Sequence, residues 1–390
     1  MPLDLGLLGQ QITAMVQVVD AEGRRRLLAQ ARDLLTSIDP LELGIMLKQR
    51  TLRLPWLVAV PGNSLAGSYA SGKCPPNYCA VAADGSSLGP DRHNPVRFYV
   101  INAGYAALIY GEHPSAALDS SAQLYFRDED LYLDPLIRSA PVEGARLSAK
   151  MCLAEMGALW EAARLARDLP VVALRDGSLI TWGLQSEDPS FVQEHFLGEF
   201  LGYLDRFREA AIPVASYISY PGARDVVNAL RAWICPQKGL ECDSCSPSGV
   251  VDLCRGLLEI IDRELFAFLA EGERSDVFGS ASAILDRYGE HSIKFFYMNV
   301  GGEVVRLEAP QWVAEDEAAL GLVQAAIHDQ CRRSPEYPRY PPVLQEAHEQ
   351  AVISAAARQV VEVLVQRALA ARGLGYVGSA KSLSKRRRTV

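Results

Sequence analysis

Residues 171–180 read VVALRDGSLI, an apolar run that stops at an acidic residue and then turns. The apolar start predicts a buried strand, and Gly177 and Ser178 are typical of the turn that follows it. Asp176 is therefore expected at the carboxyl end of a core strand. Because open α/β sheets bind their ligands at that end of their strands, the stretch predicts an α/β fold with a carboxylate at the binding edge.

The same phrase occurs earlier, as CAVAADGSS at residues 79–87, with Asp84 in the matching place. Asp-Gly is first of all a turn dipeptide, so one such phrase alone indicates only a turn after a strand. Two of them, each at the end of a core strand, favour a paired acidic site.

A third carboxylate lies on a long amphipathic helix, expected from about residue 143 to residue 168. Glu155 falls near the middle of its apolar face, and Glu161 falls at the edge. A carboxylate in an apolar stripe loses its hydration, which is costly unless a partner compensates for it. Two interpretations stay open: Glu155 belongs to the acidic site, or it pairs with an arginine such as Arg175. Glu161 replaces Glu155 as the candidate if the helical phase is wrong by one turn.

The coarse order of elements between residues 78 and 234 is three strands, helix, strand, helix, strand, helix. The strands are expected at about 78–84, 96–103, 105–110, 171–175 and 213–219, and the later helices at 191–211 and 223–234. This is the order of the ribonuclease H-like fold, an α/β mixed sheet flanked by helices. In that architecture the first strand, the first long helix and the fourth strand deliver carboxylates to one point, here Asp84, Glu155 and Asp176. Such hard oxygen ligands suit Mg²⁺ or Mn²⁺ better than Zn²⁺.

The composition is that of a globular protein. The chain has 390 residues, of which 49% are hydrophobic, enough for one large α/β domain with insertions or for two average domains. No signal peptide and no membrane-spanning run is recognisable, so we expect a cytoplasmic protein. The formal net charge of −8 argues against indiscriminate nucleic-acid binding and fits a carboxylate site that cations neutralise.

The chain is expected to divide into three parts. Residues 1–54 have a helical pattern without visible chemistry and predict an appendage that contacts a partner or a second copy. Residues 55–372 form the main domain. Residues 373–390 predict a disordered basic tail able to touch phosphates, with Lys381, Lys385, Arg386, Arg387 and Arg388.

Four cysteines crowd into an insertion at residues 235–254. Cys235, Cys242, Cys245 and Cys254 have the spacing C-x6-C-x2-C-x8-C, in which the central pair can chelate one ion and the outer pair can complete a four-thiolate site. The spacing matches neither a standard zinc ribbon nor a ferredoxin run. A structural Zn²⁺, an iron–sulfur cluster and ordinary cysteines all stay open.

Two features follow the insertion. The runs 292–299 and 303–307, joined at two glycines, predict a β-hairpin after an amphipathic helix at 251–269. His348 lies on the apolar face of a last helix that reaches Ala355. A lone histidine there is most often a core residue, but a ribonuclease H-like two-metal site takes its last ligand from a late helix, and an imidazole can serve.

Together these motifs resemble the NurA family of prokaryotic DNA-repair nucleases. The resemblance rests on their order from about residue 79 to residue 365: ADGSS, KMCLAEMGALWEA, LRDGSLI, YISYPGARDVVNALR, ERSDVFGS, HSIKFFYMNVGGEVVRLEAPQWVA and YPPVLQEAHEQAV. It implies a ribonuclease H-like fold, a homodimer and Mn²⁺-dependent exo- and endonuclease action on DNA in end resection. It also implies a hexameric HerA-type ATPase as partner and a place on the nucleoid.

The resemblance also implies site residues. Asp84, Glu155, Asp176 and His348 match the family's ligands for Mn²⁺ or Mg²⁺ in a two-ion site, and Tyr217, rather than Tyr220, is expected in the role of its tyrosine. The four-cysteine insertion has no counterpart in the minimal family pattern. The alternative is a catalytically silent DNA-binding adaptor of a ring ATPase. A zinc hydrolase is less favoured, because the chain lacks H-E-x-x-H.

Overall fold

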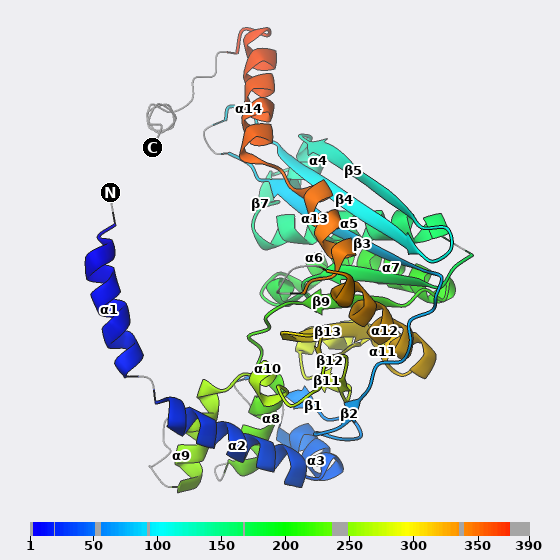
Figure 1. Cartoon of the computed structure of the whole chain (residues 1–390). Helices are drawn as coiled ribbons and strands as arrows, with labels where there is room; N and C mark the ends of the chain where they lie inside the picture. The colour runs from blue at the N-terminus through cyan, green and yellow to red at the C-terminus, as the bar shows by residue number, and fades with distance from the viewer. Residues whose placement is uncertain are drawn as a thin grey trace.

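The computed structural model describes residues 3–18, 20–50, 56–91, 94–166, 168–235, 249–334 and 339–374. A large mixed sheet runs through the molecule in the order β1-β11-β12-β13-β9-β8-β3-β4-β5, and β2 and β10 pair beside it (Figure 1). Its strands are β1 (Ala59–Val60), β2 (Ser68–Tyr69), β3 (Tyr78–Leu88), β4 (Tyr99–Tyr110), β5 (Ser115–Tyr125), β8 (Val171–Asp176), β9 (Val214–Ile218), β10 (Arg274–Ser275), β11 (Phe278–Ser280), β12 (Ile293–Asn299) and β13 (Val304–Pro310). The strands β6 (Tyr132–Asp134) and β7 (Ser139–Pro141) form a separate pair.

The centre of the sheet is parallel. β8 runs parallel to β3 on one side and to β9 on the other, whereas β4 is antiparallel to both β3 and β5. The first four residues of β8 are buried, as the apolar run predicts. Because β3 and β8 are parallel neighbours, their carboxyl ends lie at the same edge of the sheet.

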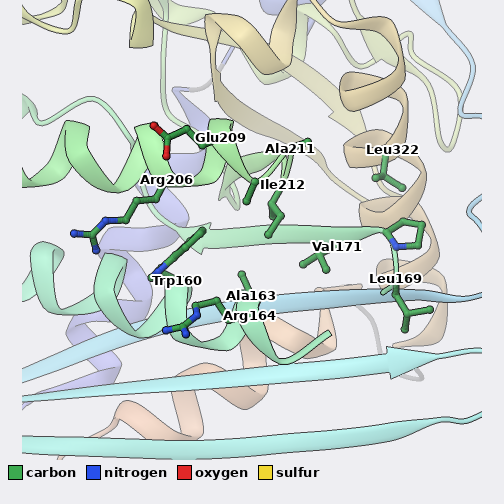
Figure 2. Close-up of a pocket in the computed structure, with 12 residues that line it drawn as sticks. Trp160, Ala163, Arg164, Leu169, Val171, Arg206, Glu209, Ala211, Ile212 and Leu322 are labelled. Carbon is green, nitrogen blue, oxygen red and sulfur yellow. The ribbon is translucent and has the colours of Figure 1, made fainter. Parts of the chain in front are cut away.

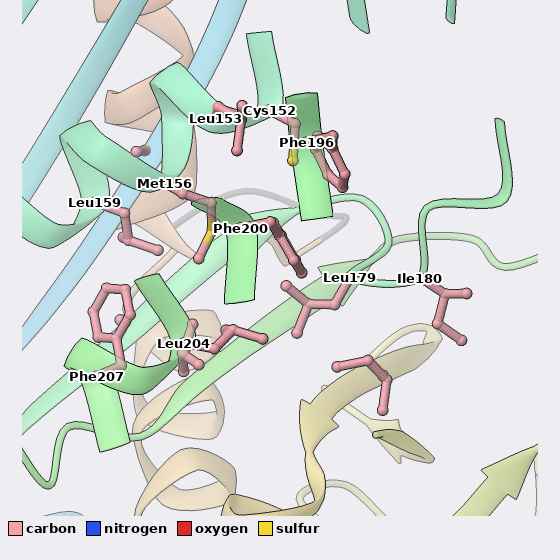
Figure 3. Close-up of a cluster of buried hydrophobic side chains, with 14 of the residues drawn as sticks. Cys152, Leu153, Met156, Leu159, Leu179, Ile180, Phe196, Phe200, Leu204 and Phe207 are labelled. Atoms are coloured by element: carbon pink, nitrogen blue, oxygen red, sulfur yellow. The ribbon is translucent and has the colours of Figure 1, made fainter. Parts of the chain in front are cut away.

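Helices cover both faces of this sheet. Alternate residues of β3, such as Val81, pack with α5 (Ala145–Ala163) and α7 (Gly198–Glu209) in one apolar cluster (Figure 3). The intervening residues, such as Ala82, pack with α12 (Glu317–Arg333) and α13 (Pro342–Ala351) in another. The predicted mixed α/β sheet flanked by helices is thus confirmed.

Three details of the predicted strands are wrong. The first strand does not end at Asp84 but continues to Leu88, paired with β4. The runs 96–103 and 105–110 form one continuous strand, β4, which passes through Gly104. A Cβ at Gly104 would lie 2.6 Å from the backbone nitrogen of Ala351, so this glycine serves a close helix approach and does not break the strand. The third strand is β5, which was missed because it is an exposed edge strand with little apolar patterning.

Three predicted helices are interrupted. The segment 191–211 comprises α6 (Pro189–Val192), a π-helical turn and α7. The segment 251–269 breaks between α9 (Gly249–Gly256) and α10 (Asp262–Leu265), where buried Asp262 accepts backbone N–H groups of α8 (Asp225–Ile234). The last helix ends at Ala351, before a separate α14 (Ala355–Ala370). The hairpin is present as β12 and β13. The short helices α4 (Asp128–Leu131) and α11 (Gln311–Ala314) complete the main body.

The N-terminal helices differ in their packing. α2 (Ala21–Ser37) and α3 (Pro40–Arg50) contribute Ala31, Leu35, Leu43 and Leu47 to a third core with α8. α1 (Leu5–Gln17) has no buried residue, and neither has α14, and both project from the body (Figure 1). Among the described helices, none is long and apolar enough to cross a membrane.

Candidate active site

The two Asp-Gly-Ser phrases lie side by side at one edge of the sheet. Ala83 on β3 is in register with Arg175 on β8, so Asp84 and Asp176 follow on adjacent strands. Because side chains alternate along a strand, both aspartates face the side of Ala82, which α13 covers. In each case Oδ1 accepts the backbone N–H of the following glycine, at 2.8 Å for Asp84 and 2.9 Å for Asp176. Burial, and then repulsion from Asp84, raise the pKa of Asp176.

His348 is delivered to this edge by α13. Its Nδ1 lies 2.7 Å from Oδ2 of Asp84, and its side chain is 57% exposed, so the interpretation of His348 as a core residue is wrong. The end of α13 is fixed over β3 and β4, because Asn102 Nδ2 and Ser86 Oγ donate to the carbonyl of Ala351 at 2.8 and 2.6 Å. Gly104, opposite Asp84 in the ladder, makes room for this approach.

Glu155 approaches from the opposite face of the sheet. It is 5% exposed, and its Oε2 accepts hydrogen bonds from Arg175 Nε at 3.0 Å and Nη2 at 2.7 Å. The ion pair with Arg175 is therefore formed. Oε1 points toward β3, because a Cβ at Gly85 would lie only 2.7 Å from it.

The three carboxylates influence one another electrostatically. Burial raises the pKa of Glu155, Arg175 lowers it, and the charges of Asp84 and Asp176 raise it further. Glu161, by contrast, is 62% exposed and pairs with Arg164 on the surface. The predicted helical phase thus brings Glu155, and not Glu161, to the strand ends.

The expected tyrosines lie differently. Tyr217 is fully buried, and its hydroxyl faces Glu303 Oε1 at 3.4 Å, whereas Tyr220 is 70% exposed beside Arg263. Tyr340 contacts Tyr217 edge-on, with the ring centroids 5.4 Å apart. Burial, and then the charges of Asp176 and Asp84, raise the pKa of Tyr340. In the sequence, Tyr340 is only a tyrosine before the last helix, and no local pattern distinguishes it.

The side chains at this edge are of the chemical types that bind a divalent cation, but they are not yet arranged around one point. Among the described residues, no group of three or more His, Cys, Asp or Glu side chains is arranged to hold a metal ion as it stands. Paired carboxylates with an imidazole are nevertheless a donor set for Mn²⁺ or Mg²⁺, and a cation would neutralise the charge of Asp84, which together with burial raises the pKa of Asp176. Since Arg175 occupies Oε2 of Glu155, Oε1 is the oxygen left for an ion.

The cysteine prediction falls partly outside the described residues. Cys242 and Cys245 belong to the segment that the structure does not describe. Cys235 follows α8 and is buried, and Cys254 lies on α9 with intermediate exposure. A metal bound by the four thiols stays a prediction.

A cavity of about 630 Å³ lies far from this edge. Trp160, Arg164, Arg206 and Ile212 line it near Val171, the first residue of β8, whereas Asp176 is the last (Figure 2). The cavity and the carboxylates therefore lie at opposite ends of the same strand.

Comparison with known proteins gives one family. The family model of the NurA domain matches residues 80–353. No curated protein matches the chain. Among solved structures the chain is similar to the NurA nuclease from Sulfolobus solfataricus, with a TM-score of 0.46 and 15% identity over 79% of this chain and 88% of that chain. It is also similar to Drosophila Piwi, with a TM-score of 0.29 and 11% identity over 70% of this chain and 29% of that chain. These structural likenesses are too weak to support an argument about activity.

Proposed function

Because the chain belongs to the NurA-domain family, we propose that it is a divalent-metal-dependent DNA nuclease with exo- and endonucleolytic action in end resection and double-strand-break repair. The observation that supports the proposal most is the acidic pair itself. Asp84 and Asp176 lie on two adjacent parallel strands, Asp176 as the last residue of β8 and Asp84 within β3, and His348 Nδ1 lies 2.7 Å from Asp84 Oδ2. The ribonuclease H-like classification remains part of this proposal.

Asp84, Asp176, His348 and Oε1 of Glu155 would hold two Mn²⁺ or Mg²⁺ ions. When bound, such ions supply a nucleophilic water and stabilise the charge on the leaving 3′ oxygen of a phosphodiester. The following glycine N–H groups orient the two aspartates by donating to Oδ1 of each. Oδ2 of Asp176 is then directed to the site, and Oδ2 of Asp84 faces His348 Nδ1, so these two side chains would approach an ion together. Arg175 orients Glu155 in the same way by taking Oε2. Tyr217 would take the role of the family's tyrosine indirectly, by positioning the ring of Tyr340 through their edge-on contact.

The partners implied by the family belong to the same proposal. A second copy of the chain and a hexameric HerA-type ATPase would require apolar contact surface outside the active site. The exposed apolar side chains of α1 provide such a surface: Leu5, Leu7, Ile12, Met15 and Val16. Action on DNA would place the protein on the nucleoid. For the four cysteines we propose a structural Zn²⁺ or an iron–sulfur cluster.

Metal removal tests the proposal. Labelled single- and double-stranded DNA should be cleaved in Mn²⁺, and cleavage should stop in EDTA and return when Mn²⁺ is restored. Absence of metal-dependent cleavage, with and without a ring ATPase, would contradict the nuclease. Binding of DNA without cleavage in the same assay would favour the silent adaptor.

Gly104→Ala tests how α13 is positioned. The new Cβ would meet backbone atoms of Gln350 and Ala351 at 2.6–2.7 Å, so α13 must shift and carry His348 away from Asp84. We expect cleavage to fall about tenfold, equivalent to ~1.4 kcal/mol in the activation barrier. Gly202→Ala on α7 is the matched control, because its Cβ would meet no atom within 4 Å. Equal activities of the two variants would refute this role of Gly104.

A further inference from the structure

A buried ion network lies on β13, one strand beyond β9. Arg306 and Glu308 are 3% and 1% exposed, and Arg306 Nε donates to Glu308 Oε1 at 2.9 Å. Arg306 Nη1 donates to Asp225 of α8, and its guanidinium lies 3.8 Å over the ring of Phe295. Removing these charges from water costs free energy that offsets much of their mutual attraction. A contribution to stability alone is therefore a weak explanation for the network.

The second carboxylate oxygen of Glu308, Oε2, contacts the turn after Asp176. Oε2 accepts the hydroxyl of Ser178 at 2.7 Å and the backbone N–H of Leu179 at 2.9 Å. Leu179 is fully buried in the cluster beneath α5 and α7 (Figure 3). Glu308 thus joins β13 to the turn through two hydrogen bonds.

The same turn holds the arginine that pairs with Glu155. Arg175 Nη1 donates to the carbonyl of Ser178 at 2.7 Å, while Nε and Nη2 hold Glu155 Oε2. A continuous hydrogen-bonded path therefore runs from Asp225 through Arg306, Glu308 and the turn to Glu155.

We propose that Glu308 is a positioning residue for the metal site. It fixes the turn after Asp176, and through Ser178 it fixes Arg175, so that Oε1 of Glu155 is held against Gly85, the residue after Asp84 on β3. Glu308 itself touches neither the ion nor DNA. The inference rests on the proposed function, because it takes Glu155 and Asp176 as ligands.

The two carboxylate oxygens explain why glutamate is needed. Oε1 accepts from Arg306, and Oε2 accepts from Ser178 and Leu179, so donors surround both oxygens. In Glu308→Gln the amide nitrogen must face donors on one side. The substitution keeps the size of the side chain but loses the hydrogen bonds either to Arg306 or to Ser178 and Leu179.

The test measures Mn²⁺ affinity by calorimetry without DNA, together with kcat, KM and Tm. For Glu308→Gln we expect Mn²⁺ affinity to fall about tenfold, as is typical when a group that orients a metal ligand is lost, and kcat to fall with KM for DNA nearly unchanged. Asp262→Asn is the matched control. Asp262 is also a fully buried carboxylate, but it accepts from Val226, Val227 and Tyr297 and makes no hydrogen bond to the turn.

Both variants should have a lower Tm, and Asp262→Asn should keep wild-type Mn²⁺ affinity and kcat. If Glu308→Gln also keeps them, Glu308 is only structural and the inference is wrong. Ser178→Ala serves if Glu308→Gln does not fold. It removes the hydroxyl that donates to Glu308 Oε2 and accepts from Ile180 N–H and Trp182 Nε1, but it leaves both oxygens of Glu308 with a donor. It should lower Mn²⁺ affinity with a smaller loss of Tm than Glu308→Gln, and an unchanged affinity would overturn the inference. A wild-type protein that neither binds Mn²⁺ nor cleaves DNA overturns the proposed function, and this inference with it.

Discussion

Asp84→Ala and Asp176→Ala are each expected to abolish Mn²⁺-dependent cleavage while the protein stays folded. Each side chain would supply an oxygen ligand beside the end of β8, and its hydrogen bond to the next backbone N–H adds little to the core. We expect a loss of at least about a hundredfold in kcat, equivalent to ~2.7 kcal/mol in the barrier. Tm should change little in either variant, because removing one carboxylate relieves the repulsion between Asp84 and Asp176, and the contact with His348 that Asp84→Ala also removes involves an exposed imidazole.

Glu161→Ala is the control for these variants. Glu161 is a carboxylate of α5, six residues beyond Glu155, and its side chain is 62% exposed. Activity in this variant should equal that of the wild type. Near-wild-type cleavage by either aspartate variant would remove both residues from the proposed site.

Arg175→Ala is expected to cause the largest loss of stability. Glu155 is 5% exposed, and Arg175 supplies both hydrogen bonds to its Oε2. Removing one member of a buried ion pair leaves an uncompensated charge, so the free energy of unfolding should fall by about 3–5 kcal/mol. Denaturant unfolding measures this loss. Arg164→Ala breaks an exposed pair with Glu161 and should cost less than about 1 kcal/mol.

The pH dependence of stability in the Arg175→Ala protein follows from the direction in which the pKa of Glu155 shifts on folding. Burial already raises the pKa of Glu155, and Arg175 opposes that rise. Without the arginine, the pKa of Glu155 in the folded protein rises further above its value in the unfolded chain. Between these two pKa values the folded protein binds more protons than the unfolded chain does. Stability should therefore fall as pH rises through the interval and recover toward acid pH. Glu155→Gln in the Arg175→Ala background should restore much of the loss at neutral pH; equal stability of the single and double variants would contradict the assignment.

The sequence predicts the two acidic strands well because their signal is local. An apolar run followed by Asp-Gly-Ser identifies a strand and its acidic residue within ten positions, both for Asp84 and for Asp176. It identifies the end of the strand only for Asp176, because β3 continues past Asp84 to Leu88, where pairing with the long strand β4 holds it extended. The phase of α5 was equally readable, since an apolar stripe fixes which face is buried. That Glu155 pairs with Arg175 was only one of two open interpretations, because hydrogen-bond geometry across two elements is not written in a local pattern.

Long-range features were harder to predict. The strand β5 was missed because an edge strand with exposed side chains has no apolar alternation. Gly104 looked like a break between strands, although its role depends on α13, which lies about 250 residues away in sequence. Tyr340 and Glu308 drew no attention for the same reason, since their partners lie on distant elements.

The most direct test of the account is the position of bound Mn²⁺ in crystals of the wild-type protein, located by its anomalous scattering. The account predicts Mn²⁺ in contact with the carboxylates of Asp84 and Asp176, with His348 or Oε1 of Glu155 among the further ligands. Mn²⁺ bound only elsewhere, with the carboxylates of Asp84 and Asp176 free of it, would contradict the account.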